Sequence, residues 1–292
     1  MLHKGSNLEM PLPKISVVTP SLNQARFIEE TIQSVINQKY PDIEHIIIDG
    51  GSTEGTIEIL KKYPHLHWIS EPDRGQAHAL NKGFRMATGE IIGWLNSDDT
   101  YCPNIFHAIA EEFKNNDIFI VCGDGFETDD NSKVLRPLYS RHTQPEDLIR
   151  YWKWKYEFVQ PAFFFRRSIF DEIGYLDESL YYAMDYDYFI RLGLRYEFKY
   201  IRQPFANLRL YGESKTGRNF QKIVPSYIHE IHKVSKRFWG TPTHLKYYGY
   251  LFSFFGAIIF SVIKNIFFTP TSKSRAAVKR LFGNMRILSI ES

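Results

Sequence analysis

Four short apolar runs follow one another in the first third of the chain, and each ends in polar residues before a helical pattern begins. The runs lie at residues 15–19, 45–48, 66–69 and 90–95. Between them, apolar residues recur every three or four positions, which is typical of helices with one buried face. Continuous apolar strands that alternate with helices indicate a mostly parallel sheet covered on both faces. The pattern therefore predicts an α/β fold.

Polar side chains stand at the carboxyl ends of these predicted strands. They are Asn23, Asp49, Asp73, Asp98 and Asp99. In open α/β sheets, ligands bind beyond the carboxyl ends of the strands. We therefore expect the fold to gather on one rim residues that the sequence keeps far apart.

The pattern is weaker after residue 103. Apolar runs predict strands over 118–121 and 161–165, and helical spacing predicts helices over 186–194 and over 220–238, the latter interrupted near Pro225. Residues 125–157 are polar and aromatic, without a clear period.

The charge is unevenly distributed along the 292 residues. The net charge is +3, but residues 231–290 carry ten Lys or Arg and no Asp or Glu, which leaves −6 on residues 1–230. An acidic body argues against nucleic acid binding, whereas a basic tail suits an anionic surface. Two cysteines exclude a disulfide framework and a four-cysteine zinc site, and they fit a reducing compartment.

Two adjacent carboxylates, Asp98 and Asp99, follow the fourth predicted strand directly. Mg²⁺ and Mn²⁺ usually take one or two carboxylates together with phosphate oxygens of a substrate. Asp and Asn also favour plain solvated turns. Because Asp49 and Asp73 are expected on the same rim, we predict a Mg²⁺ or Mn²⁺ site at Asp98 and Asp99.

Residues 49–56 (DGGSTEGT) combine a strand end, a glycine-rich turn and the start of a helix. The stretch is neither a dinucleotide fingerprint nor a P-loop, because it lacks the G-x-G-x-x-G spacing and the Gly-Lys-Ser/Thr sequence. A carboxylate here can accept hydrogen bonds from a base or a ribose. An ordinary loop before a capped helix is the alternative.

Five motifs in order resemble the inverting family-2 glycosyltransferases, which have the GT-A fold. They are TPSLNQ at 19–24, SVINQKYP at 34–41, IDGGST at 48–53, EPDRGQ at 71–76 with NKG at 81–83, and LNSDD at 95–99. Weaker matches extend to about residue 216. The resemblance implies a GT-A type α/β fold with a mostly parallel central sheet flanked by helices.

The resemblance also implies that a nucleotide-diphospho-sugar donor binds at the rim, with Asp49 at the base and Asp98 or Asp99 at the metal. Asn96 stands where many members have Asp, so the direct metal ligand is left open between Asp98 and Asp99. The expected donor residues are Thr19, Pro20, Ser21, Asn23, Asp49, Gly50, Ser52, Glu71, Asp73, Gly75, Gln76, Asn81, Lys82, Asn96 and Asp98.

Residues 183–192 are similar to the family's acidic motif at the start of an acceptor-side helix, where the carboxylate aligned with Asp185 is the general base. A positioned carboxylate can take the proton of an attacking hydroxyl. Met184 stands where the family usually has Glu, and helix capping is the alternative role for Asp185. The expected residues of the acceptor and diphosphate side are Gln160, Asp187, Arg191 and Lys215.

Residues 208–216 resemble the segment that folds over the diphosphate. Many members carry His where Tyr211 stands, and a neutral Tyr is a poor ligand for Mg²⁺. Lys215 is positioned to offset phosphate charge, or it is an ordinary surface lysine.

These features predict a metal-dependent inverting glycosyltransferase that moves a sugar from a nucleotide donor, UDP by default, to a hydroxyl of a glycan or lipid-linked acceptor. The setting implied is bacterial surface polysaccharide or glycolipid assembly. The alternatives are a sugar nucleotidyltransferase and a non-catalytic module that binds sugar nucleotides or glycans. We expect an N-terminal extension over 1–13, a GT-A domain over 14–218 with donor and acceptor halves that meet near residue 124, and a basic helical region over 219–292.

The apolar segment 247–268 is the candidate for membrane contact. It is barely long enough to span a bilayer, and basic residues flank both of its ends. A spanning helix, a core helix and a helix lying in the interface all fit, and we favour the interfacial helix beside anionic lipid. The first 14 residues lack the apolar run of a secretory signal. We therefore expect a cytoplasmic protein at the inner face of the cell membrane.

Overall fold

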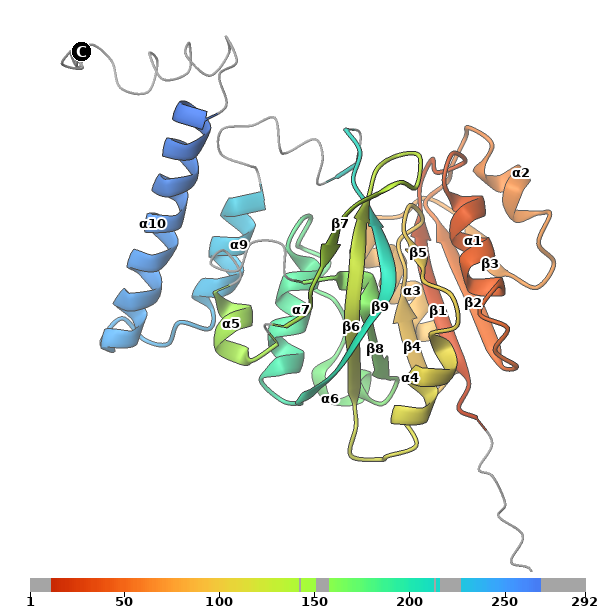
Figure 1. Cartoon of the computed structure of the whole chain (residues 1–292), viewed down its shortest axis with the longest axis horizontal. Helices are drawn as coiled ribbons and strands as arrows, with labels where there is room; N and C mark the ends of the chain where they lie inside the picture. Colours follow the sequence, from red (N-terminus) through yellow and green to blue (C-terminus); the bar gives the residue numbers. More distant parts are fainter. Residues whose placement is uncertain (1–11, 142, 151–157, 213, 216–226, 269–292) are drawn as a thin grey trace, which may run out of the picture.

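The structure is a computed structural model that describes residues 12–141, 143–150, 158–212, 214–215 and 227–268. A nine-stranded sheet with helices on both faces makes up its body, and two further helices lie at one end (Figure 1). Most of the predicted N-terminal extension, the beginning of the helix expected over 220–238 with Pro225, and the basic residues from 269 onward lie outside the described residues.

The first part of the fold is the repeat of strands and helices that the hydrophobic pattern predicted. Its elements are β1 (Ile15–Ser21), α1 (Ile28–Ile36), β2 (Ile43–Asp49), α2 (Thr56–Leu60), β3 (His67–Ser70), α3 (Gln76–Met86) and β4 (Ile91–Trp94). The four strands pair in parallel in the order β3-β2-β1-β4.

The second part of the sheet is mixed. Its elements are β5 (Thr100–Tyr101), α4 (Phe106–Glu112), β6 (Ile120–Thr128), β7 (Val134–Leu138), α5 (Pro145–Ile149), η2 (Gln160–Ala162), β8 (Phe163–Arg166), α6 (Ile169–Ile173), α7 (Met184–Gly193) and β9 (Phe198–Arg209). Strands β8, β7 and β5 run against their neighbours, whereas β6 and β9 share the direction of β1–β4. Six of the nine strands therefore run the same way, which confirms a mostly parallel sheet.

The sequence pattern did not predict β5, β7 or β9. Strand β9 is twelve residues long, but its burial does not alternate, and its pairing with β6 shifts register twice. Without a period of two, nothing in the sequence of this segment indicates a strand.

Both faces of the sheet are buried. On β8, Phe163 and Phe165 belong to the core cluster under α3 and α7, whereas Phe164, between them, belongs to the cluster that includes Phe106 and Phe205. Successive side chains of a strand point to opposite faces. The alternation explains why this strand is an uninterrupted apolar run in the sequence.

Helix α3 lies unusually close to β1, and Gly83 permits this. A Cβ atom at Gly83 would lie 2.4 Å from Cγ1 of Val18 and 3.3 Å from Cγ1 of Ile48. Because α3 begins at Gln76, this packing also fixes the position of a predicted donor-site residue.

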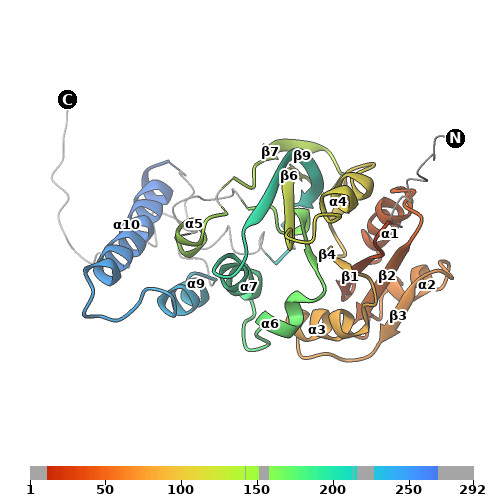
Figure 2. The ribbon, with the colours of Figure 1, turned by 90° about the horizontal axis from the view of Figure 1, so that it is seen from below.

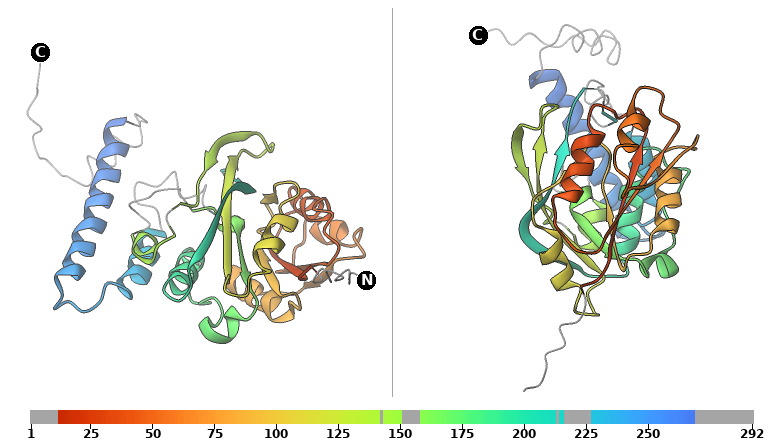
Figure 3. Two further views of the ribbon diagram at one scale, coloured as in Figure 1. Left: turned by 60° about the horizontal axis from the view of Figure 1, so that its bottom comes forward. Right: turned by 90° about the vertical axis from the view of Figure 1, so that its right-hand side faces the viewer.

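The two C-terminal helices, α9 (Tyr227–Lys236) and α10 (Leu245–Phe268), continue the core on the side of α7. Val234 of α9, Trp239 after it, and Tyr250 and Phe254 of α10 are buried in the same cluster as α3 and α7. Helix α9 lies between α7 and α10, so that α10 forms the end of the molecule remote from β3 (Figures 2 and 3). Within the described residues, none of the helices has both the length and the hydrophobicity that crossing a membrane requires.

We expect Gly83→Ala to lower the free energy of unfolding by about 1–3 kcal/mol, because the added methyl group overlaps Val18 in a packed core. Urea denaturation followed by circular dichroism measures this change. Gly249→Ala is the matched control, since it too is a helix-interior glycine but has nothing within 4 Å of the added atom. It should cause no loss, and equal effects of the two substitutions would contradict the close packing of α3.

Candidate functional site

The carboxyl ends of the first three parallel strands lie side by side, as the sequence pattern predicted. In the sheet register, Ser21 pairs with Asp49, and Asp49 pairs with Ser70. Strand β4 lies on the other side of β1, where Val18 pairs with Trp94. Residues separated by up to about fifty positions are thereby brought to one rim.

Asp49 organises the centre of this rim. Its buried carboxylate accepts four hydrogen bonds: Oδ2 from the backbone N–H groups of Gly51 (3.0 Å) and Ser52 (2.8 Å) and from the Ser70 hydroxyl (2.7 Å), and Oδ1 from the Ser52 hydroxyl (2.5 Å). The carboxylate therefore holds the glycine-rich turn against the end of β3.

Asn23 connects the loop after β1 to the loop after β2. Its N–H donates to Oγ of Ser52 (2.7 Å), and its side-chain Oδ1 accepts from the N–H of Thr53 (3.1 Å). Its φ of 54° is left-handed, a conformation that Asn tolerates better than most residues. Nearby, the buried hydroxyl of Ser21 has no hydrogen-bond partner within the described part of the chain.

The loop after β3 packs on the same turn. A Cβ atom at Gly50 would lie 2.7 Å from Oδ2 of Asp73, so a side chain at this position would displace the Asp73 carboxylate. Oδ1 of Asp73 accepts from the N–H of Gly75 (2.7 Å). Glu71 pairs with Lys82 at 2.6 Å, and this hydrogen bond and charge lower the pKa of Glu71.

Asn96 connects α3 and the end of β4 to Asp99 and to Gln160 of η2. Its Oδ1 accepts from Nε2 of Gln76 (2.9 Å) and from the indole N–H of Trp94 (3.1 Å). Its Nδ2 donates to Oδ2 of Asp99 (3.0 Å) and to Oε1 of Gln160 (2.9 Å). Two donors and two acceptors use the full capacity of the Asn96 amide.

Asp98 and Asp99 differ in their surroundings. Both oxygens of Asp99 are engaged, Oδ1 with the N–H of Arg209 (2.9 Å) and Oδ2 with Asn96, whereas Asp98 accepts at Oδ2 from the hydroxyl of Tyr211 (3.2 Å). Burial and the charge of Asp98 raise the pKa of Asp99 to about 8. Burial raises the pKa of Asp98 as well, and burial and the charge of Asp98 raise the pKa of Tyr211 to about 12.

Arg209 is a site residue that the sequence did not indicate. Its buried guanidinium donates to the carbonyl of Asp98 (2.8 Å), to Glu30 of α1 (2.5 Å) and to the hydroxyl of Ser132 (3.0 Å), and it lies 4.5 Å from the ring centroid of Phe27. Arg209 thus fixes the turn that carries Asp98 and Asp99. The sequence around Arg209 gives no indication of this role, because apolar and polar residues do not alternate along β9.

Asp185 lies in the first turn of α7 beside Lys215. Its Oδ1 accepts from the N–H of Tyr186 (2.7 Å). Burial raises the pKa of Asp185, while the charge of Lys215 lowers it. Lys215 donates to Oε1 of Gln76 (3.0 Å) and lies 4.2 Å from the ring centroid of Tyr181. The lysine therefore connects the start of α3 to the neighbourhood of Asp185.

Four residues expected in the site, Thr19, Asn81, Asp187 and Arg191, are engaged in structural contacts. The Thr19 hydroxyl shares a hydrogen bond with buried His45 (3.0 Å), and Asn81 exchanges two with the backbone of Leu176 (3.0 Å each). Arg191 donates to Asp187 (2.9 Å) on its own helix and to the carbonyls of Ile173, the last residue of α6, and Tyr175. We leave these four out of the proposed site.

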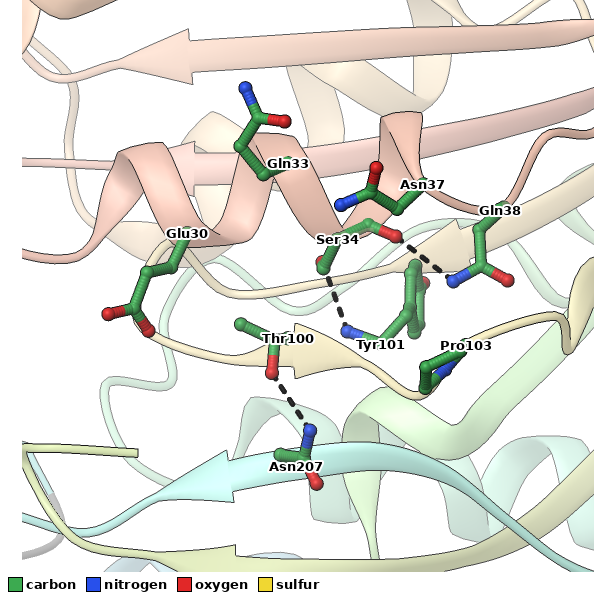
Figure 4. A pocket seen from close by; sticks show the side chains of 9 residues that line it. All are labelled: Glu30, Gln33, Ser34, Asn37, Gln38, Thr100, Tyr101, Pro103 and Asn207. Carbon is green, nitrogen blue, oxygen red and sulfur yellow. Dashed lines mark hydrogen bonds between the residues drawn. The ribbon is translucent and has the colours of Figure 1, made fainter. Parts of the chain in front are cut away.

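A groove of about 360 Å³ lies between α1 and strands β5 and β9 (Figure 4). It is lined by polar side chains such as Gln33, Asn37 and Asn207, and it contains none of the residues predicted for the site. Asn207 is hydrogen-bonded to Thr100 across it (3.0 Å). Nowhere in the described ranges do three His, Cys, Asp or Glu side chains come together as a metal-binding group.

A family model described as glycosyl transferase family 2 matches residues 16–174. The match covers more than half of the chain, so the chain belongs to glycosyl transferase family 2. This confirms the class of enzyme predicted from the motifs.

Two curated relatives indicate the range of the family. Chondroitin synthase of Escherichia coli is 28% identical over 214 residues, which are 70% of this chain and 30% of the relative. The putative teichuronic acid biosynthesis glycosyltransferase TuaG of Bacillus subtilis is 40% identical over 95 residues, which are 30% of this chain and 37% of the relative. The chain thus spans less than half the length of both.

Solved structures confirm the GT-A type fold. S. aureus TarS 1–349 in complex with UDP-GlcNAc has a TM-score of 0.64 at 15% identity and covers 90% of this chain and 77% of that chain. The mannosyltransferase PcManGT from Pyrobaculum calidifontis, in complex with GDP-Man and Mn²⁺, has a TM-score of 0.56 at 18% identity. The match covers 92% of this chain and 79% of the mannosyltransferase chain. At these identities the likeness concerns the fold alone.

We expect Asn96→Asp to lower the free energy of unfolding by about 1–3 kcal/mol, measured by urea denaturation in EDTA. The new carboxylate has no N–H to donate to Gln160 and places a second negative charge beside Asp99. Asn116→Asp, in an exposed turn, is the control and should change stability by less than about 0.5 kcal/mol. If Asn96→Asp were as stable as the unsubstituted chain, the hydrogen bonds of the Asn96 amide would not contribute to the stability of the fold.

Proposed function

We propose that the chain transfers a sugar from a nucleoside-diphosphate donor, UDP-linked in the first instance, to a hydroxyl group, with inversion at the anomeric carbon. The observation that carries the proposal is the position of Lys215, which is hydrogen-bonded to Gln76 on the donor side and whose charge acts on Asp185. The side chain of Lys215 therefore lies between the proposed nucleotide site and a carboxylate suited to general base catalysis.

The donor site comprises the loops that follow the parallel strands, centred on Asp49, Ser52 and Asp73. Buried Ser21, whose hydroxyl lacks a partner among the described residues, supports a ligand at this rim. UDP, UDP-GlcNAc and GDP-Man complexes of the structural neighbours make these nucleotides the natural candidates.

Asp98 is the residue that best fits a divalent metal. Asp99 uses both oxygens within the protein, whereas Asp98 accepts one weak hydrogen bond from Tyr211 on the same rim. Mg²⁺ or Mn²⁺ bound there, completed by phosphate oxygens and water, would supply charge stabilisation for the departing diphosphate. Asp99, held by Arg209 and Asn96, positions the turn.

The reaction is a single displacement. The acceptor oxygen forms a bond to the anomeric carbon as the bond from that carbon to the diphosphate breaks, and the acceptor's proton passes to the carboxylate of Asp185. The bonding electrons leave with the nucleoside diphosphate, whose negative charge Lys215 is placed to stabilise. Elevation of the pKa of Asp185 by burial makes it a better proton acceptor than an exposed carboxylate.

Binding and chemistry are separable by two substitutions. In a thermal-shift titration with UDP, GDP, dTDP and CDP, each with and without Mn²⁺, we expect one nucleotide to raise the melting temperature more with metal. Asp98→Asn should abolish the effect of the metal, whereas Asp185→Asn should retain it and reduce turnover by about 10²–10⁴-fold.

Turnover is followed as release of the nucleoside diphosphate from the corresponding sugar donor. Unchanged turnover by Asp185→Asn would contradict the general base. Nucleotide binding without turnover by the unsubstituted chain would favour a non-catalytic binding module.

We also propose that α10 lies on an anionic membrane surface. One face of the helix packs on α9, and the other exposes an apolar stripe at helical spacing, with exposed fractions of 89% for Leu245, 72% for Phe252 and 59% for Ile259. Lys246 is exposed on the same helix, Lys233 and Lys236 are exposed on α9, and five more basic residues follow in the sequence from 273 to 286. An apolar face beside lysines suits acidic lipid headgroups.

We expect the full chain to sediment with phosphatidylglycerol-containing vesicles and much less with phosphatidylcholine vesicles. Replacement of both Phe252 and Ile259 by Ser should weaken vesicle binding at least about tenfold, because each buried side chain contributes roughly 1.5–3 kcal/mol. Leu135→Ser is the control, since Leu135 is equally apolar and 52% exposed but lies on β7. Equal binding by all three proteins would contradict docking through α10.

A further inference from the structure

Helix α7, which carries Asp185, begins without a capping side chain of its own. The residue at its N-cap is Ala183, which makes no side-chain hydrogen bond to the helix. The first backbone N–H groups of any helix have no acceptor within the helix, and a local Ser, Thr, Asp or Asn usually supplies one. Within the first turn, the N–H of Tyr186 has an acceptor in the Asp185 carboxylate. An acceptor for the N–H groups that lead into the helix must come from elsewhere in the fold.

Glu230 of α9 supplies it. Its Oε2 accepts from the backbone N–H groups of Tyr182 (2.6 Å) and Ala183 (2.9 Å), and both of its oxygens accept from that of Tyr181 (3.1 Å each). One carboxylate thus holds three consecutive N–H groups directly before the turn that carries Asp185. Hydrogen bonds from backbone N–H groups to an ionised carboxylate are stronger than those between neutral groups.

A second contact holds α9 to the same helix. Nη1 of Arg237 donates to Oδ1 of Asp187 (2.9 Å), and its guanidinium also pairs with Asp177 (3.2 Å). The other oxygen of Asp187 accepts from Arg191 (2.9 Å). Helix α9, through Glu230, therefore contacts the backbone just before α7, and Arg237, directly after α9, contacts the flank of α7. Apolar packing of Val234 in the shared core supports both contacts.

The charge of Glu230 also reaches Asp185. Two charged side chains outside α7 act on the Asp185 carboxyl: Lys215, in the segment after β9, lowers its pKa, and Glu230 raises it. Within α7, Asp187 and Arg191 are paired with each other. Glu230 has therefore both a geometric and an electrostatic influence on the proposed base.

We propose that Glu230 is a positioning residue for Asp185, which fixes the backbone entering α7 and thereby the direction of the Asp185 carboxylate toward the acceptor hydroxyl. The inference rests on the proposed function of Asp185 as general base. It assigns the C-terminal helices a part in catalysis in addition to any contact with a membrane.

The test compares Glu230→Ala, Glu230→Gln and Asp185→Asn in the full chain, with UDP release from UDP-GlcNAc to water as the probe. Glu230→Ala should lower kcat about 10–100-fold with the donor KM changed less than about twofold, because displacement of a catalytic group by 1 Å can cost about 100-fold in rate. Glu146→Ala is the control, since that carboxylate also pairs with the C-terminal helices, at Lys246, but from the surface of α5. It should leave kcat unchanged.

Glu230→Gln separates geometry from charge. Its side-chain oxygen can still accept from the N–H groups of Tyr182 and Ala183, so kcat at the optimum should stay within about threefold of the unsubstituted chain, well above the Glu230→Ala value. Removal of the negative charge lowers the pKa of Asp185, so the acidic limb of the pH profile of kcat should move to lower pH. A purely structural role of Glu230 would not move that limb.

The outcomes distinguish this inference from the proposed function. If Asp185→Asn is inactive while Glu230→Ala has the kcat of the unsubstituted chain, the assignment of Asp185 as general base is supported and the positioning role of Glu230 is overturned. If Asp185→Asn is fully active, both are overturned. Hydrogen exchange gives a test that needs no turnover: the amides of residues 181–183 should exchange faster in Glu230→Ala, and unchanged exchange overturns the inference.

Discussion

The amide of Asn96 is the interaction on which the rest of the site depends. Its four hydrogen bonds connect α3, β4, the turn of Asp98 and Asp99, and η2, and Gln76 extends the network to Lys215. Buried polar networks of this kind specify one arrangement when every member is paired, and they are costly when one partner is lost. The network also explains why Asn, and not Asp, fits position 96, because a carboxylate could not donate hydrogen bonds to both Asp99 and Gln160.

The C-terminal helices share the hydrophobic core of the sheet and helices beside them. Their buried aromatic residues belong to the core cluster that lies under α3 and α7. One face of α10 packs on α9 while the opposite face is exposed. Glu230 of α9 and Arg237, directly after it, in turn contact the entry and the flank of α7. In this arrangement the surface that we propose for lipid and the proposed general base are separated by a single helix.

Membership of glycosyl transferase family 2 and the GT-A type fold agree with the local chemistry. The parallel strands bring together the rim that we propose for the nucleotide, and the second part of the fold supplies Gln160, Arg209 and Lys215. Arg209 shows how the two halves depend on each other, because from β9 it holds the turn after β4, α1 and the turn between β6 and β7. A site of this kind exists only when both halves are folded.

The sequence by itself determined the α/β class, the four parallel strands and the sharing of one rim by Asp49, Asp73 and Asp98. The physical reason is that hydrophobic periodicity is local, and the carboxyl ends of parallel strands must lie at the same edge of a sheet. Only the tertiary structure decided which of these residues are engaged by the protein itself, as both oxygens of Asp99 are, and which polar groups come from a distance. Arg209 and Glu230 lie more than forty residues from the groups they hold. Arg209 lies in a strand without alternation, and the helical spacing around Glu230 predicts the helix but not which distant N–H groups its carboxylate accepts from.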